Sequence, residues 1–336
     1  MFSPGNKMYS LLTESSTYLI LLSQKRYNFN TRGGASEHHD FVEQLKGKDT
    51  SFSQINGFIT KVSWGNAEQT LSRDIFRLAQ QMDLTRHMSF YYTSVGHFYN
   101  ALFSLGIMFV LLYCKLFMGL TGAEADLYEL KDNKWVSRVQ AALFGSQLVQ
   151  FTVMTMIAGV FCLAIEKSLY ESIKTHLSII GRGGLMFFSF ILGTKALSYQ
   201  NKILYGDGGY VGTGRGLGLQ HEPFSELYRQ HGSNQILLGF EIAFALIVYR
   251  YLSGIHLDDN RNQLNETFPL VLVAISFIWT PFILNPSALN CDVIREDWDK
   301  FLDWMEVSGG KKDQSWYVIV AILLILIGAL YGLFTS

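Results

Sequence analysis

The chain has 336 residues, of which 49% are hydrophobic, 14% aromatic and only 16% charged. A soluble domain of ordinary composition carries about 25% charged residues. This balance argues against an ordinary soluble enzyme and indicates a polytopic helical membrane protein with a modest soluble part. The formal net charge of -1 gives no basic field that would attract nucleic acid, so no nucleic-acid partner is expected.

Residues 1–94 are predicted to form the soluble part of the chain. Residues 28–49 are polar and contain glycine, so loops and short elements are expected there, whereas residues 58–62 have the composition of a short strand. A helix is predicted over residues 67–81, because Asn66 is a favourable N-cap and apolar residues follow it at helical spacing.

Apolar runs dominate the rest of the chain, and the fold expected from them is all-α with about six transmembrane helices. A helix needs about 20 mostly apolar residues to cross the hydrocarbon layer. The runs cover residues 98–120, 141–165, 177–197, 236–252, 268–284 and 316–334. Glu241 lies inside the fourth run, and a carboxylate at that depth is expected to face protein or a wet cavity.

The distribution of Lys and Arg orients these helices, because cytosolic loops carry an excess of both. Arginines before the first run place the N-terminal part in the cytosol, and residues 199–233 and 290–314 are assigned to the same side. The acidic residues of 254–266 assign that loop to the outside. Three apolar runs separate the N-terminal part from residues 199–233. Two segments on the same side of the membrane must be joined by an even number of crossings. The run at 177–198 is therefore expected to be irregular, because a Gly183–Gly184 pair interrupts it.

A further helix is predicted over residues 290–306, and it is amphipathic. Its apolar face holds Ile294, Trp298, Phe301, Leu302 and Met305, whereas its acidic residues lie mostly elsewhere. Such a helix could lie in the membrane interface or cap the cytosolic domain. Its acidity argues against tight binding to anionic lipid, which favours the capping role.

The best candidates for substrate binding are Lys61, Glu68, Gln69, Arg73 and Asp74. Transfer from a sugar nucleotide needs cations near the departing diphosphate, which Lys61 and Arg73 could supply. Gln69 and Arg73 stand four residues apart and would share a helix face. Glu68 or Asp74 could order the basic groups or act as a general base. The alternative is a charged surface helix with ordinary ion pairs, and spacing alone favours it by about two to one.

Two other motifs are expected to carry no chemistry. The glycine-rich residues 212–218 lie in a polar loop between apolar runs, without the strand and helix that a dinucleotide fingerprint requires. His38, His39 and Asp40 lack a second ligand pair at metal-binding spacing, so a solvated loop is expected and no metal site is assigned.

Several long segments resemble one protein family in the right order. The chain's FITKVSWGNAEQTLSRDIFRL resembles the pattern FxxKVxxGNGEQxLSRDxYRL, and FILGTKALSYQNKILYGDGGYVGTGRGLGLQHEPFSELYRQHG resembles FxLGTKxHYYGRTxLHGGAxYxxTGRGFVxxHxxFxENYRLYxRSH. NTRGGASEHHDFVEQLKGKD and IWTPFILNPSALNCDVIREDWDKFLDWM resemble two further segments. Together they identify the chain as a member of the 1,3-β-glucan synthases, glycosyltransferase family 48.

The resemblance implies an integral membrane enzyme, expected in the plasma membrane with its N-terminal part cytosolic. It would transfer glucose from UDP-glucose to a growing 1,3-β-glucan of the callose type and pass the polymer across the bilayer. The expected partners are the lipid bilayer, the β-glucan, the rest of the synthase and a small GTPase regulator. No cofactor bound by this chain is expected, and a divalent metal requirement is left open.

Departures from the family pattern limit what this chain would do alone. Ala67 replaces a glycine of the GNGEQ pattern, and residues 198–202 depart from HYYGR. The family's sugar-nucleotide-binding part, with its main acidic residues, lies upstream of the segments matched here. Residues 1–94 are thus expected to be the C-terminal remnant of a cytosolic glycosyltransferase domain, and residues 95–336 the transmembrane domain. The alternative is a non-catalytic membrane scaffold or glucan-channel remnant.

Overall fold

The computed structural model describes residues 51–80, 83–122, 168–206, 221–252, 260–286 and 290–312, together with 157, 159–161 and 163–165. Every regular element within these residues is a helix, which confirms the all-α prediction for this part of the chain. The strand predicted at residues 58–62 is wrong, because these residues lie inside a long helix. The loops predicted at residues 28–49 and 212–218, with His38, His39 and Asp40, lie outside the described residues.

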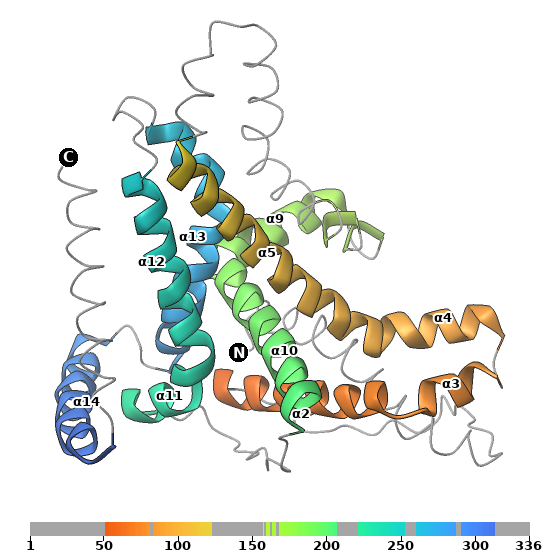
Figure 1. Cartoon of the computed structure of the whole chain (residues 1–336), viewed down its shortest axis with the longest axis horizontal. Helices are drawn as coiled ribbons and strands as arrows, with labels where there is room; N and C mark the ends of the chain where they lie inside the picture. The colour runs from red at the N-terminus through yellow and green to blue at the C-terminus, as the bar shows by residue number, and fades with distance from the viewer. Residues whose placement is uncertain are drawn as a thin grey trace, which may run out of the picture. The chain divides into compact units, whose positions relative to one another are not determined.

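The described helices appear in chain order in Figure 1. They are α2 (Phe52–Leu71), α3 (Asp74–Ala79), α4 (Leu84–Thr93), α5 (Val95–Thr121), α9 (Leu169–Gly181), α10 (Gly184–Tyr205), α11 (Phe224–His231), the π-helix η2 (Gly232–Ile236), α12 (Leu237–Leu252), α13 (Asn260–Ile283) and α14 (Cys291–Lys312).

These helices belong to two compact units, and the division falls inside two of them. The first unit holds α2, α3, α4, the start of α5 up to Gly106 and the part of α10 from Ile191 onward. The second unit holds the remainder of α5 and α10 together with α9 and α11 to α14. This division concerns packing alone. The predicted boundary at residue 94, between a glycosyltransferase portion and a membrane portion, stays a prediction.

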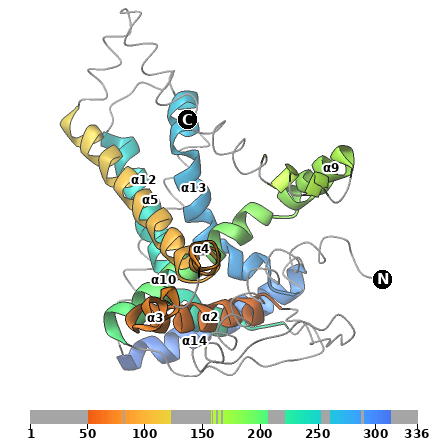
Figure 2. The ribbon, with the colours of Figure 1, turned by 90° about the vertical axis from the view of Figure 1, so that its right-hand side faces the viewer.

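The first unit is built on α2, which begins at Ser51. The Ser51 side chain accepts a hydrogen bond from the Gln54 amide at 3.2 Å, which satisfies one of the free N–H groups at the helix start. Asn66 is therefore not an N-cap but an interior residue of α2. The core of this unit consists of Val62, Ala67, Phe98 and Tyr199, with Phe58, Tyr99, Leu102 and Ile203 packed against it. Within this unit α4 runs back above α2 and α3 (Figures 1 and 2).

The second unit contains a pair of helices, α12 and α13, that pack side by side (Figures 1 and 2). Their close approach depends on Gly239. A Cβ built at this position would lie 2.8 Å from Cγ1 of Ile278 and 2.9 Å from Cβ of Phe277. Because neither atom is the far end of a flexible side chain, only glycine fits here without a shift of one helix.

Two described helices are long and apolar enough to cross a membrane, Val95–Thr121 and Phe224–Tyr251. A third is obtained if α9 and α10, which meet at a 72° bend, count as one broken span. The expected six spans are thus not found within the described residues. Thr267–Ile283, the fifth predicted run, is apolar but shorter, whereas residues 141–156 and 316–334 lie outside the described residues.

The bend between α9 and α10 confirms that the third run is irregular. It occurs at Gly183, whose φ of 81° lies in the left-handed region that other residues rarely adopt. A chain in this conformation cannot continue an α-helix, so the helix ends at Gly181 and restarts at Gly184. The sequence pair Gly183–Gly184 thus has a direct structural consequence.

Exposed apolar side chains form a band along α5. Phe103, Ile107, Val110, Leu111, Tyr113, Phe117 and Leu120 are all exposed. This band covers about 27 Å at 1.5 Å per residue, close to the roughly 30 Å of a bilayer's hydrocarbon layer. Its length and composition therefore suit contact with lipid over residues 103–120.

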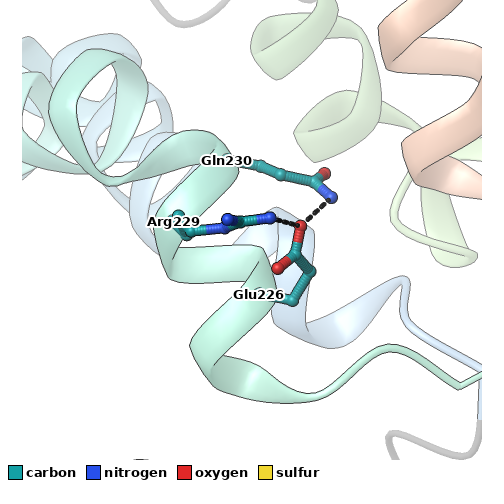
Figure 3. A network of polar contacts seen from close by, with 3 residues as sticks. All are labelled: Glu226, Arg229 and Gln230. Carbon is teal, nitrogen blue, oxygen red and sulfur yellow. Dashed lines mark hydrogen bonds and ion pairs between the residues drawn. The ribbon is translucent and has the colours of Figure 1, made fainter. Parts of the chain in front are cut away.

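The first turns of the Phe224–Tyr251 helix are polar, in contrast to α5. In α11, Arg229 and Gln230 both donate hydrogen bonds to Oε1 of Glu226, at 2.9 and 3.1 Å (Figure 3). This network occupies the start of the candidate span, and the continuous apolar stretch of the helix begins at Ile236.

The helix predicted over residues 290–306 is present as α14, and its apolar residues occupy two faces. Phe301 packs against Tyr228 of α11 with ring centroids 5.7 Å apart, whereas Ile294, Trp298 and Leu302 are exposed. The Phe301 contact is with α11 of the same unit and not with residues 1–94, so the capping and interfacial roles both stay predictions.

Candidate functional site

Three of the predicted substrate-binding residues lie on α2 and two lie beyond its end. Lys61 is half-buried, Glu68 is exposed and Gln69 is buried. Arg73 is exposed in the segment between α2 and α3, and Asp74 is the first residue of α3. These five residues therefore do not share one continuous helix.

The predicted pairing of Gln69 with Arg73 on one helix face is wrong. The helix ends at Leu71, and Ser72 adopts an extended conformation with φ −86° and ψ 161°. The Ser72 hydroxyl donates to the carbonyl oxygen of Gln69 at 2.9 Å, a local bond that competes with the helical backbone. The i, i+4 relation needs an unbroken helix, and this break removes it.

Two side-chain carbonyl oxygens near the end of α2 are buried without a hydrogen-bond donor among the described residues. They are Oδ1 of Asn66 and Oε1 of Gln69. Asn66 is fully buried, and its amide donates to the carbonyl oxygen of Val62 at 2.8 Å. A buried carbonyl oxygen without a donor is costly, and both oxygens are closed off from solvent in this structure.

Glu68 has a specific partner on α10. Its Oε1 lies 3.0 Å from Nζ of Lys202, and the side chains are 65% and 11% exposed respectively. The Lys202 ammonium also donates to the carbonyl oxygen of Gly206 at 3.4 Å. Glu68 thus supplies the counter-charge for a mostly buried cation and fixes the end of α2 against α10.

Tyr199 connects the same two helices. Its hydroxyl lies 2.6 Å from Oγ1 of Thr70, and its ring is fully buried. The ring stacks on Phe98 at 5.8 Å between centroids and meets Tyr99 edge-on at 5.4 Å. Aromatic pairs in these geometries stabilise a core beyond the area they bury.

Two further polar pairs continue this contact. Thr194 donates to Oδ1 of Asn56 at 2.6 Å, and both residues are buried. Nζ of Lys195 lies 3.0 Å from Nε2 of His97 on α5. An ammonium can only donate, so His97 accepts at Nε2 and carries its proton on Nδ1.

The first unit therefore contains a polar seam, defined here by Asn56, Thr70, Thr194, Lys195, Tyr199, Lys202, His97 and Glu68. The sequence analysis identified only Glu68 among these as a site residue. A signal was present in the spacing of Lys195, Tyr199 and Lys202, because positions i, i+4 and i+7 share one helix face. Within the described residues no group of three or more His, Cys, Asp or Glu side chains could hold a metal ion.

The family model for the 1,3-beta-glucan synthase component matches residues 26–323. The chain belongs to the 1,3-β-glucan synthase family. The match includes all five predicted substrate-binding residues and every helix of the polar seam.

Curated plant relatives agree with this assignment. The chain of this glucan synthase family member is 31% identical to callose synthase 7 of Arabidopsis thaliana over 293 residues, which cover 86% of this chain and 15% of the relative. It is 32% identical to callose synthase 5 of the same plant over 297 residues, covering 87% of this chain and 15% of the relative. The chain thus spans about 15% of the length of these relatives. No solved structure matches it.

Proposed function

We propose that this chain supplies the C-terminal, membrane-embedded part of a 1,3-β-glucan synthase. In the assembled enzyme, glucose is transferred from UDP-glucose to a growing 1,3-β-glucan, and the polymer passes through the membrane helices. The observation that carries this proposal is the family match over residues 26–323. The chain spans about 15% of its relatives, so the main acidic residues of the transfer are assigned to the rest of the synthase.

The candidate residues take different roles in this proposal. Lys61 and Arg73 stabilise the negative charge that develops on the departing diphosphate. Gln69 binds a sugar hydroxyl through its side-chain amide, which requires the buried carbonyl end of that side chain to become accessible in the assembled enzyme. Glu68 is a positioning residue, because its carboxylate is engaged by Lys202. Asp74 keeps its proposed role of ordering the basic groups.

The proposed setting follows the sequence expectations. The first unit lies on the cytosolic side of the plasma membrane, where UDP-glucose is available. A small GTPase regulates the assembled synthase. The cytosolic setting is supported by the distribution of charge, and the plasma membrane and the GTPase by the family.

A second function, a non-catalytic scaffold or glucan-channel remnant, is favoured by one observation. Arg73 lies beyond the end of α2, so the described residues do not gather the two proposed phosphate-binding cations on one helix. In this alternative the chain keeps the membrane helices of the family without contacting the donor.

Substitution of the two cations separates these functions. Lys61→Ala and Arg73→Ala in the complete synthase should each lower UDP-glucose-dependent glucan synthesis roughly 100-fold, with unchanged protein in the membrane. Arg86→Ala is the control, because Arg86 is 79% exposed and pairs only with nearby Asp83 at 3.3 Å in the described part of the chain. Unchanged synthesis in both variants would remove these residues from the site and support the scaffold.

A further inference from the structure

The helix α12 carries a carboxylate on an exposed apolar face. Glu241 is exposed, and so are Leu237 and Phe244, its neighbours at i−4 and i+3. The adjacent Phe240 and Ile242 are buried, and Phe240 belongs to the core of the second unit. Glu241 therefore points away from that core, and the described residues offer its carboxylate no hydrogen bond or ion pair.

The position of Glu241 along the helix places it within the apolar part of the span. The polar network of α11 ends at Gln230 (Figure 3), and the continuous apolar stretch begins at Ile236. Glu241 lies about 7.5 Å further along the axis at 1.5 Å per residue. A carboxylate facing hydrocarbon at that depth is costly and normally faces a protein partner or a water-filled cavity. The exposed apolar side chains of Leu237 and Phe244 on either side of Glu241 favour a protein partner over a wet cavity.

Three of the chain's other apolar runs contain no cation for this carboxylate. Residues 141–165, 268–284 and 316–334 contain no Lys, Arg or His. In the run at 177–197, Lys195 is engaged by His97 at 3.0 Å, and Arg182 lies at the end of α9. Lys115 of α5 lies over the ring of Tyr249, 5.7 Å from its centroid. Tyr249 is about 12 Å from Glu241 along the helix axis, so this lysine serves the far end of α12.

Two other occupants of this face are also disfavoured. A second copy of the chain, docked through the same face, would bring two carboxylates together in a medium of low dielectric. Lipid chains have no donor to offer, and the short glutamate side chain cannot extend to the interface as Lys and Arg do.

We propose that the face formed by Leu237, Glu241 and Phe244 docks a membrane-spanning helix from outside these 336 residues. That helix carries a Lys or Arg at the depth of Glu241, and apolar residues one turn to either side contact Leu237 and Phe244. The inference goes beyond the proposed transferase function, because it concerns assembly and holds whether or not the chain contributes to catalysis.

Site-specific cross-linking in native membranes tests this surface. A photoreactive residue is placed at Leu237 or Phe244 of the full chain, and the product is identified by mass spectrometry. The expected product is a membrane-spanning peptide from outside these 336 residues with Lys or Arg within one turn of the attachment point. A photoreactive residue at Phe117, which is 67% exposed on α5, is the control and should label lipid. Labelling of lipid alone, a second copy or the chain's own runs from α12 would overturn the proposal.

The role of charge requires a second set of variants. Glu241→Gln and Glu241→Leu should lower the cross-linking yield from Phe244 at least tenfold, because loss of one member of a buried charge pair weakens association by roughly that factor or more. Glu241→Asp should retain most of the yield. Glu241→Lys should lower the cross-linking yield by repelling the partner's cation. A second substitution that replaces that cation with Glu should restore the yield. An unchanged cross-linking yield in Glu241→Leu would refute the role of charge. This variant should still fold, because leucine suits a helix in lipid. None of these readouts needs glucan synthesis, so failure here and failure of the transferase function are distinguishable.

Discussion

The ion pair between Glu68 and Lys202 predicts a specific pattern of stability changes. Lys202 is only 8% exposed, and its Nζ lies 3.0 Å from Glu68 and 3.4 Å from the Gly206 carbonyl oxygen. Glu68→Gln leaves this cation without its counter-charge. A fully buried pair loses about 3–5 kcal/mol on removal of one partner, whereas an exposed pair loses about 0–1 kcal/mol. Glu68 is 65% exposed, so we expect a loss of about 2 kcal/mol in the free energy of unfolding.

Reversing both charges gives a double-mutant cycle for this ion pair. Glu68→Lys and Lys202→Glu each bring like charges together and should lower the free energy of unfolding further than Glu68→Gln. The double variant restores an opposite pair and should recover about 2 kcal/mol relative to the sum of the single losses. The assay is the unfolding of the full chain in mixed micelles, followed by far-ultraviolet circular dichroism because the described residues are helical.

A second pair in the same chain is the matched control. Glu296 and Lys300 on α14 lie 2.7 Å apart, but both side chains are more than 60% exposed at 68% and 64%. The Lys300 ammonium lowers the pKa of the Glu296 carboxyl, chiefly through the hydrogen bond between them. The same reversal cycle there should show no measurable coupling in 0.15 M salt. If the losses from Glu68→Lys and Lys202→Glu simply added in the double variant, as expected for the control pair, Glu68 would not be a positioning residue.

Three further substitutions test the packing by the same unfolding assay. Gly183→Ala should lower the free energy of unfolding by about 1–2 kcal/mol, because alanine is strained at positive φ. Gly181→Ala is the control and should not destabilise, because a Cβ there meets open space. Equal effects of the two variants would contradict the role of the bend. Gly239→Ala should cost about 1–3 kcal/mol through overpacking against α13, and Gly106→Ala, which meets nothing within 4 Å, is its control. Tyr199→Phe should cost about 1 kcal/mol by removing the hydrogen bond to Thr70, and no loss would exclude that bond.

Much of the membrane part could be predicted from the sequence, because long apolar runs impose helices whatever their surroundings. The predicted run 98–120 corresponds closely to Val95–Thr121, and the Gly183–Gly184 pair marked the bend. The helix predicted over residues 290–306 is present as α14, which extends to Lys312. The helical structure of residues 58–62 was not predicted, because a short apolar stretch fits a strand and a half-buried helix equally well.

The candidate site was harder to predict because it depends on contacts between distant residues. Asn66 has the character of an N-cap by local rules, yet tertiary packing places it inside α2 with a buried carbonyl oxygen. Glu68 and Lys202 are far apart in the sequence, and no local pattern indicates that they meet. The break at Ser72 also follows from one side-chain hydrogen bond that helical periodicity does not reveal. The sequence therefore supplied candidate residues for the site, but it did not indicate which distant residues they contact.

The most direct test of the central claim is whether glucan synthase activity accompanies this chain. An antibody raised against residues 291–312 is used to precipitate the protein from gently solubilised native membranes. The precipitate is assayed for transfer of glucose from UDP-glucose into a polymer that a 1,3-β-glucanase digests. Our account predicts that activity follows the chain into the precipitate and is depleted from the supernatant. Activity that stays entirely in the supernatant after the chain has been removed would contradict it.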